Sequence, residues 1–363
     1  MEKIKQKKTG KPDRILLAAV LVLTVCGLVI LLSASSYNGS VRFGDPAYYF
    51  KKQLFAAALG LVVMYGVSRI DYHCFLSLAP WAYLLSLILS TAVLFAGQEI
   101  NGSRRWLSLG PLSFQPSEFA KAAVILFLAW QIGRTKGDTS HIWIMCRTML
   151  TLFPVVGLVG SNNLSTAVII LGTGGLLIFV SNPRYLPFVG MGAAAAAFIT
   201  VFLAAESYRL ERLAIWRDPE KYEKGFQTIQ GLYAIGSGGL FGRGLGSSLQ
   251  KLGFVPEAQN DMIFSVICEE LGLAGAGCLL MVFALLLWRL CVNASSCRDL
   301  EGALISAGIM GHLAIQVILN IAVVTNTIPN TGITLPFISY GGTSVVFLLA
   351  EMGLALSVSS SRK

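Results

Sequence analysis

The sequence predicts an all-α polytopic membrane protein with about ten transmembrane helices. Hydrophobic residues make up 55% of the 363 residues, and charged residues make up 13%, where a soluble domain carries about 25%. Apolar runs of about twenty residues recur along the chain, and about twenty apolar residues are needed to cross the hydrocarbon core. Three polar, proline- and glycine-rich segments interrupt these runs.

The apolar runs define one membrane domain, residues 15–359, between a basic tail, 1–14, and a short tail, 360–363. No separate soluble domain and no low-complexity linker interrupts it. The predicted spans are 15–34, 53–68, 75–96, 119–134, 142–159, 164–181, 185–205, 264–290, 302–325 and 339–358.

Basic residues set the expected orientation. The first tail carries Lys3, Lys5, Lys7, Lys8, Lys11 and Arg14, and the positive-inside rule places it in the cytoplasm. An even number of spans returns the second tail to the same side, and the turns on that side carry Arg69, Arg134, Lys136, Arg184, Arg289 and Arg298. Residues 206–261 then form a large extracytoplasmic loop between spans seven and eight.

Composition excludes several other classes. The seven cysteines fall in spans or on the cytoplasmic side, so we expect no disulfides, and their spacing indicates no metal site. The net charge of +9 is explained on the cytoplasmic side by the predicted topology and by attraction to anionic lipid headgroups. These two causes do not explain the basic residues predicted outside: Arg104, Arg105, Arg209, Arg212, Arg217, Lys221, Lys224, Arg243 and Lys251. No stripe of basic and aromatic residues on a soluble domain indicates nucleic-acid binding.

The three polar segments, 97–118, 206–261 and 326–342, all fall on the extracytoplasmic side. Irregular backbone at membrane depth must be buried in protein or line a wet cavity. We therefore expect the three segments to meet at one outward-facing, water-accessible cavity. The alternative is that they are ordinary amphipathic loops lying on the bilayer.

Asp261 is the leading candidate for chemistry, because it lies where the longest polar segment meets an apolar span. A carboxylate at the mouth of a partly desolvated cavity suits a general base near neutral pH. Glu257, about one helical turn earlier, could assist it or help to hold a divalent ion. The alternative is an acid that only stabilises the start of a helix through the helix dipole.

Other charges lie inside predicted spans. Glu118 and Lys121 are three residues apart and share a helix face, so they could form a structural ion pair or bind substrate. Glu269, two turns after Asp261, is expected to face the same cavity. Glu270 and Glu351 are expected to cap or hydrogen-bond to neighbouring helices.

The glycine-rich run 237–246 matches no nucleotide-binding pattern. Its backbone N–H groups could instead hold anionic oxygens. With Arg243 and Lys251 close by in the sequence, we expect a phosphate-bearing lipid headgroup as the ligand.

These motifs resemble the SEDS family, which includes FtsW, RodA and SpoVE. The resemblance covers nearly the whole chain. It rests on 101–106 with 115–118 and Lys121, on Gln227 and Gln230 through the glycine run to 256–264 and 269–272, and on 335–342. Residues 33–36 and 45–53 are more similar to the FtsW/SpoVE branch than to RodA, whereas 161–165 departs from the family pattern and lacks its acid.

The resemblance implies an inverting peptidoglycan glycosyltransferase in the bacterial cytoplasmic membrane, with both termini cytoplasmic and an extracytoplasmic active site. Its substrate is lipid II, a disaccharide-peptide on undecaprenyl pyrophosphate. The family's essential acid falls on Asp261. The residues expected to bind substrate are Glu118, Lys121, Arg104, Arg105, Gln227, Gln230, Arg243, Lys251 and Glu257.

The resemblance also implies a divalent cation, Mg²⁺ or Mn²⁺, that no identifiable motif binds. The implied partners are a class B penicillin-binding protein, which is a transpeptidase, and other divisome membrane proteins. Cell division and sporulation both stay open as the process served. A lipid II flippase, or a scaffold that activates the transpeptidase without catalysis, are the alternative functions.

Overall fold

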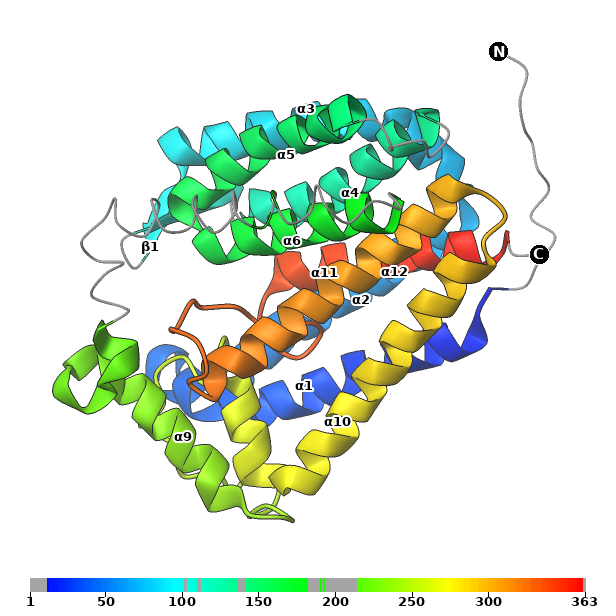
Figure 1. Ribbon diagram of the computed structural model, residues 1–363. Coiled ribbons are helices and arrows are strands. Elements are labelled where there is room, and N and C mark those ends of the chain that lie inside the picture. The colour runs from blue at the N-terminus through cyan, green and yellow to red at the C-terminus, as the bar shows by residue number, and fades with distance from the viewer. Residues whose placement is uncertain are drawn as a thin grey trace.

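The computed structural model describes residues 12–100, 103–109, 112–135, 142–181, 190, 192 and 214–361. Long α-helices run alongside one another in a single bundle (Figure 1). The helices are α1 Arg14–Phe43, α2 Tyr48–Arg69, α3 Tyr72–Ala96, α4 Pro116–Arg134, α5 Ile142–Asn162, α6 Leu164–Ser181, α9 Phe226–Gly238, α10 Ile263–Ser296, α11 Leu300–Val324 and α12 Gly342–Ser359. We call the end of the bundle that carries Arg14 and Ser359 the tail end, and the opposite end the loop end.

Within the described ranges, seven helices are long and apolar enough to span a membrane: α1, α2, α3, α6, α10, α11 and α12. Helices α4 and α5 pack against α3 and α6 within the same bundle. The predicted span 185–205 lies outside the described residues, apart from 190 and 192. The multi-pass helical fold is therefore confirmed, whereas the number ten stays a prediction.

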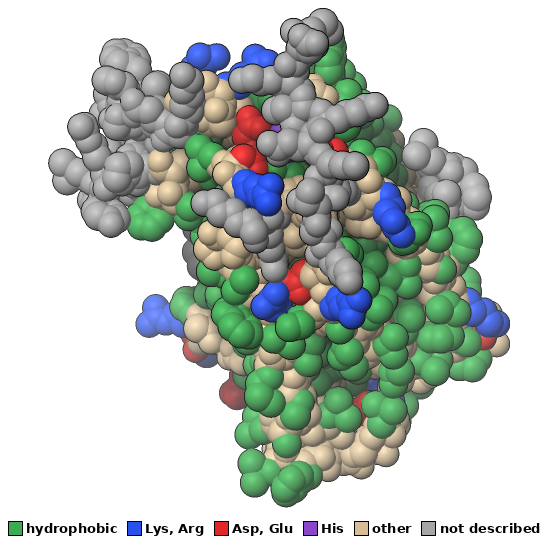
Figure 2. All heavy atoms as spheres, turned by 90° about the vertical axis from the view of Figure 1, so that its right-hand side faces the viewer, with side chains coloured by type: hydrophobic (Ala, Val, Ile, Leu, Met, Phe, Trp, Pro, Cys, Tyr) green, Lys and Arg blue, Asp and Glu red, His purple; other side chains and the backbone are tan. Residues whose placement is uncertain are grey.

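The surface suits a lipid environment. Figure 2, which views the tail end, shows basic and acidic side chains gathered on that end and apolar side chains along the flanks. Large apolar side chains are exposed on several helices, among them Val62 at 69%, Trp81 at 70% and Phe95 at 80%. In water such surface would be costly, but in a bilayer the lipid tails cover it.

Helix α1 continues well past the predicted end at residue 34. Asp13 caps its first turn by accepting hydrogen bonds from the N–H groups of Ile15 and Leu16. The helix continues through the polar stretch that follows the apolar run, where the Ser36 and Ser40 hydroxyls donate to carbonyls of the preceding turn, at 3.0 and 2.9 Å. The helix ends at Gly44, whose φ of 68° is left-handed.

Helix α10 is broken at Gly272, where φ is 67° and ψ is −174°. The predicted span 264–290 lies within α10, which is long and apolar enough to cross a membrane. The structure adds the break: residues 263–271 form a short arm, and the chain then turns into the long segment that crosses the bundle (Figure 1). The glycine-rich run supplies hydrogen-bond donors to backbone carbonyls at the break. The N–H groups of Arg243 and Gly244 donate to the carbonyls of Glu269 and Glu270, both at 2.9 Å.

These N–H groups of Arg243 and Gly244 are therefore engaged by the helix break, not oriented toward an anion as the sequence suggested. The run must approach the arm closely, since a Cβ on Gly242 would lie 2.2 Å from the Glu270 carbonyl oxygen. Glycine is the residue that permits both this contact and the left-handed φ of 75° at Gly242.

Segment 97–118 forms a small antiparallel sheet where the sequence predicted irregular backbone. Its strands are β1 Gln98–Ile100, β2 Ser103–Leu109 and β3 Leu112–Phe114, in the order β1-β2-β3. Phe114 pairs with Leu107 in register, and the Thr343 hydroxyl of α12 donates to the Ser113 carbonyl at 2.8 Å. The sheet is therefore fastened to the loop end of the helical bundle.

The predicted loop 206–261 contains α9 and two short 3-10 helices, Pro219–Lys221 and Glu223–Gly225; its residues 206–213 lie outside the described ranges. The Trp216 indole N–H donates to the Asn326 carbonyl at 3.0 Å. This contact joins the start of the described part of the loop to the segment that follows α11.

The break in α10 makes a testable prediction. Gly272→Ala places a Cβ 2.3 Å from the Gly242 nitrogen at a left-handed φ, so we expect a loss of about 1–3 kcal/mol of stability, seen as a lower midpoint of thermal unfolding in detergent. Gly277→Ala, in the regular part of the same helix with no atom within 4 Å of the new Cβ, is the control. Equal midpoints for the two variants would contradict this account of the break.

Candidate functional site

Asp261 lies in the turn before α10, which begins two residues later at Ile263. Its side chain is half-buried, and the Gln227 side-chain amide of α9 donates to Oδ1 at 3.4 Å. On the other side of the carboxylate, a Cβ built on Gly332 would lie 3.9 Å from Oδ2. Two of the three polar segments, 206–261 and 326–342, therefore meet at this carboxylate.

The turn that carries Asp261 is held by polar contacts. Glu257 has a left-handed φ of 52°, and its Oε1 pairs with Arg42 of α1 at 3.0 Å. Its Oε2 accepts from Asn260 at 2.7 Å and from Gln259 at 3.2 Å. The Glu257 carboxylate is thus engaged in shaping the turn, and this geometry does not favour its predicted role as an assistant to Asp261.

The segment after α11 braces the same turn. The Tyr340 N–H donates to the Gln259 carbonyl at 2.9 Å, and the Ser339 hydroxyl donates to the Asn260 carbonyl at 2.6 Å. Gln53 of α2, which is 2% exposed, in turn donates to the Ser339 carbonyl at 3.1 Å.

Glu118 and Lys121 form the expected ion pair, with 3.1 Å between Oε1 and Nζ and both side chains almost fully buried. The pair is part of a longer polar chain. Lys121 Nζ donates to Gln316 Oε1 at 3.1 Å, the same oxygen lies 3.0 Å from His312 Nε2, and His312 Nδ1 lies 2.8 Å from Glu351. Glu351 bonds to the neighbouring helix α11, as the sequence predicted.

Arg104 and Arg105 line a recess at the loop end. The recess has a volume of ≈ 280 Å³ including its open mouth, and its polar wall also holds Ser117, Asn162 and Asn163. Arg105 Nε donates to the Asn162 carbonyl at 3.0 Å. The adjacent Ser165 hydroxyl donates to the Thr331 carbonyl at 2.7 Å, next to Gly332, so all three polar segments are linked around this end.

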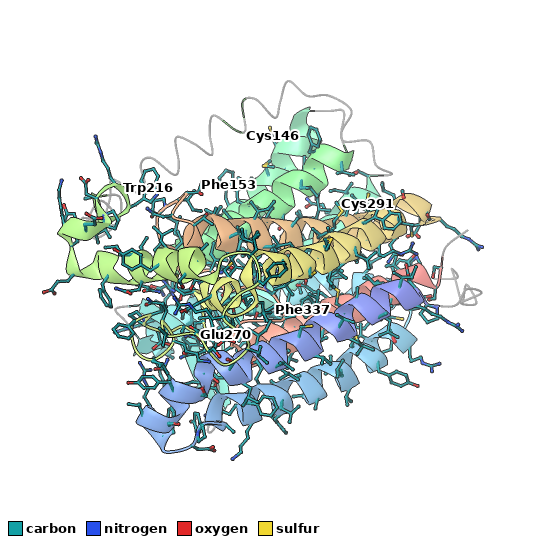
Figure 3. All side chains as sticks on the ribbon, turned by 90° about the horizontal axis from the view of Figure 1, so that it is seen from below. Cys146, Phe153, Trp216, Glu270, Cys291 and Phe337 are labelled. Atoms are coloured by element: carbon teal, nitrogen blue, oxygen red, sulfur yellow. The ribbon has the colours of Figure 1, made fainter. Side chains whose placement is uncertain are left out.

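Lys251 and Arg243, the two basic residues expected to bind a headgroup, lie beside the acids of the short arm of α10. Lys251 is 3% exposed and pairs with Glu270 at 2.6 Å; its ammonium also donates to Ser33 of α1 at 2.8 Å. Arg243 is exposed beside the break in α10, 3.9 Å from Glu269. Figure 3 shows Glu270 where the loop that precedes α10 crosses α1. The geometry of Lys251 favours a structural role.

Glu269 does not share the surroundings of Asp261. It is 1% exposed, and its carboxylate accepts from the Leu249 N–H at 3.0 Å, the Gln250 N–H at 3.4 Å and the Ser248 hydroxyl. The expectation that Glu269 faces the same cavity assumed that Asp261 lies on the helix, whereas α10 begins at Ile263 and Glu269 contacts the loop 247–251. Glu269 holds that loop in place.

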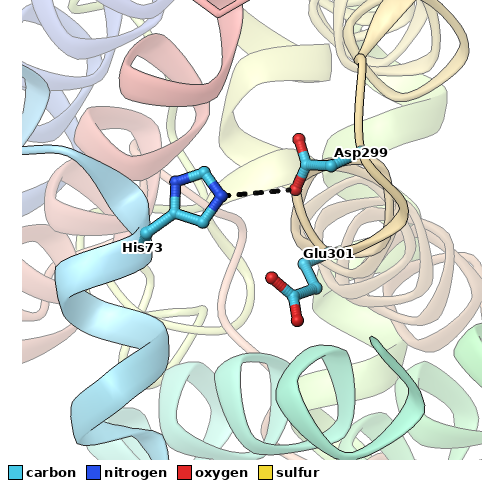
Figure 4. Close-up of side chains that lie close together, drawn as sticks. All are labelled: His73, Asp299 and Glu301. Carbon is cyan, nitrogen blue, oxygen red and sulfur yellow. Dashed lines mark ion pairs between the residues drawn. The ribbon is translucent and has the colours of Figure 1, made fainter. Parts of the chain in front are cut away.

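Among the described residues, one group of His, Cys, Asp and Glu is spaced to hold a metal ion: His73, Asp299 and Glu301, with ligand atoms within 4.8 Å of one another (Figure 4). His73 also contacts Asp71 at 2.7 Å and Asp299 at 3.7 Å, which suits an ion pair between α3 and α11. Glu301 lies nineteen residues before Asn320, the α11 residue that contacts Asp261. At 1.5 Å per residue this is about 28 Å, too far for an ion to act at Asp261.

Gln230, three residues after Gln227 on α9, is half-buried. Sequence reasoning missed His312, Gln316, Asn320 and Ser339. The available signal was a run of polar side chains inside an apolar span, since such residues face the bundle interior and are frequently functional.

Comparisons with known proteins agree with this architecture. The family model for FtsW, RodA and SpoVE, described as cell cycle proteins, matches residues 13–363. Stage V sporulation protein E of Bacillus subtilis is 37% identical over 97% of this chain and 98% of its own length. A probable peptidoglycan glycosyltransferase FtsW of Trichlorobacter lovleyi is 36% identical, over 97% of this chain and 94% of its own.

Among solved structures, a chain from work on how a peptidoglycan synthase complex coordinates polymerization and crosslinking superposes with a TM-score of 0.81. It is 32% identical, and the match covers 96% of this chain and 97% of that one. Sequence and fold therefore agree over nearly the whole length: the chain belongs to the FtsW/RodA/SpoVE family, on its FtsW/SpoVE branch.

Proposed function

We propose that this chain is a peptidoglycan glycosyltransferase that polymerises lipid II at the outer face of the cytoplasmic membrane, with Asp261 as its general base. The observation that carries the proposal is the setting of Asp261: a half-buried carboxylate with Gln227 on one side and the Gly332 segment on the other. The relative of Trichlorobacter lovleyi, 36% identical, is named a probable peptidoglycan glycosyltransferase.

The proposed step is a single displacement. The 4-hydroxyl oxygen of GlcNAc on one lipid-linked sugar attacks C1 of MurNAc on the donor, and its proton passes to Asp261. The new bond joins that oxygen to C1, and the bond from C1 to the pyrophosphate oxygen breaks, with the electron pair leaving on undecaprenyl pyrophosphate. One base is enough for inversion at C1, and a base contributes about 10²–10⁴-fold.

The other predicted site residues divide into four groups in this proposal. Gln227 orients the carboxylate, and Gln230 on the same helix face contacts substrate. Arg104 and Arg105, in the recess at the same end of the bundle, offset negative charge on the leaving group. Glu118 and Lys121 support the site from the interior, whereas Arg243, Lys251 and Glu257 stabilise the surrounding loops.

A divalent cation, Mg²⁺ or Mn²⁺, would supply further charge to stabilise the pyrophosphate. The described residues near Asp261 do not assemble a ligand set for it, since Glu257 is engaged by Arg42 and the group His73, Asp299 and Glu301 lies at the tail end. No step above therefore depends on a metal ion.

The orientation and the partner are part of the same proposal. With the tail end cytoplasmic, as its basic residues favour, Asp261 faces the outside, where the glycan strands are built. The solved chain with a TM-score of 0.81 comes from work on a complex that coordinates polymerization and crosslinking. We propose an equivalent partner here, a class B penicillin-binding protein, together with other divisome membrane proteins, in septum synthesis during division or sporulation.

The base assignment predicts that Asp261→Asn lowers lipid II polymerisation about 10²–10⁴-fold, because the amide cannot take the proton. The measurement is glycan-strand formation by the purified chain with its transpeptidase partner. Asp45→Asn is the control: Asp45 is another acid at the loop end, and its carboxylate is paired with Lys51 at 2.8 Å.

Near-normal polymerisation by Asp261→Asn would refute the assignment. Movement of labelled lipid II by proteoliposomes that contain only this chain would favour a flippase instead. Normal growth of cells in which Asp261→Asn replaces the original chain would favour a scaffold.

The buried pair makes a second prediction that separates its two possible roles. Lys121→Met leaves the Glu118 carboxylate without its cation, and breaking a buried pair costs about 3–5 kcal/mol, so the unfolding midpoint should fall. The double variant Glu118→Gln/Lys121→Met removes both charges and should recover most of that stability.

Activity of the double variant decides between the roles. If the pair is structural, polymerisation recovers together with stability. If the charges contact substrate, stability recovers and polymerisation does not. A double variant as unstable as Lys121→Met would contradict the pairing itself.

A further inference from the structure

We propose that Asn320 of α11 is the residue that positions Asp261. This inference rests on the proposed function and adds a residue to it. Asn320 is 0% exposed, and its side-chain nitrogen donates to the Asp261 carbonyl at 2.9 Å and to the Ile333 carbonyl at 2.6 Å. One amide therefore joins the turn that carries the base to the segment on the other side of the carboxylate.

The Asp261 turn depends on donors from the C-terminal part of the chain. Three successive carbonyls, those of Gln259, Asn260 and Asp261, accept from the Tyr340 N–H, the Ser339 hydroxyl and the Asn320 amide. Tyr340 and Ser339 belong to a loop, but Asn320 belongs to a helix of 25 residues. The Asn320 hydrogen bond thus fixes the backbone of Asp261 against a rigid helix, and a fixed backbone sets the direction in which the carboxylate points.

The second bond of Asn320 acts on the opposite wall of the site. The Ile333 carbonyl follows Gly332, the residue beside Asp261 Oδ2. Gln316 lies four residues earlier on the same helix face, and its amide donates to the Thr334 carbonyl at 3.0 Å. Two amides on one face of α11 therefore hold two consecutive carbonyls of this segment, and Asn320 sets the spacing between the segment and Asp261.

Both N–H groups of the Asn320 amide have an acceptor available, whereas its Oδ1 is buried without a hydrogen-bond partner among the described residues. The amide therefore acts through its N–H groups. Loss of the amide leaves two carbonyls without their donor and lets the two segments separate. A displacement of about 1 Å between reacting groups can cost about 10²-fold in rate. The rate constant kcat should therefore respond more than substrate binding.

The test compares Asn320→Ala with Asn293→Ala. Asn293 of α10 is also 0% exposed and also donates to a backbone carbonyl, that of Ala355 at 3.5 Å, but it lies in the half of α10 toward the tail end. Both variants lose a buried amide. We expect Asn320→Ala to lower kcat for lipid II polymerisation about 10–100-fold with KM changed less than about 3-fold, and Asn293→Ala to keep kcat when rates are referred to folded protein.

Two further variants keep the comparison informative. Asn320→Asp keeps the shape of the side chain but replaces both N–H donors by an oxygen, so its kcat should fall at least as far as that of Asn320→Ala. Asn320→Ser keeps a single donor and carries the same comparison if Asn320→Ala does not fold.

Equal kcat values for the Asn320 and Asn293 variants would overturn the inference, as would a loss of activity that only follows the loss of folded protein. Failure of the base assignment is a separate result: Asp261→Asn would then stay active. If Asp261→Asn is inactive while the Asn320 variants keep full kcat, the positioning role alone is refuted.

Discussion

Non-helical backbone at the loop end must find hydrogen-bond partners inside the protein, and much of the site follows from that constraint. In a bilayer an unpaired N–H or C=O group costs several kcal/mol. The carbonyls at the break in α10 accept from Arg243 and Gly244, and those of the Asp261 turn accept from Tyr340, Ser339 and Asn320. The donors that satisfy the backbone also fix the place of the carboxylate.

Buried charge follows a similar rule. Glu118 pairs with Lys121, Lys251 with Glu270 and Arg289 with Asp13, at 2.6 to 3.1 Å, and the His312 ring contacts the Glu351 carboxylate at 2.8 Å. Three of these contacts join segments far apart in the sequence, and the fourth is extended to α11 through Gln316. A buried charge is tolerated when it is paired and hydrogen-bonded. These contacts therefore align the helices as well as balance the buried charges.

The two ends of the bundle consequently differ in character. At the tail end, charges pair across helix termini, as in the group His73, Asp299 and Glu301. At the loop end, the polar segments enclose the half-buried Asp261, whose carboxylate accepts from Gln227 at 3.4 Å, and Arg104 and Arg105 line a recess at the same end. A carboxylate at the same end of the bundle as two guanidinium groups suits proton transfer from a sugar hydroxyl that displaces an anionic leaving group.

Local patterns were enough to predict the membrane class, most helix positions, the Glu118–Lys121 pair and the candidacy of Asp261, because hydropathy and the spacing of three residues on a helix are local properties. Only the tertiary structure showed that Gly272 breaks α10, that Lys251 serves Glu270 and Ser33, and that Asn320 meets Asp261 from 59 residues away. Those partners are chosen by packing between distant segments, and no local pattern encodes which buried carbonyl a given amide will reach.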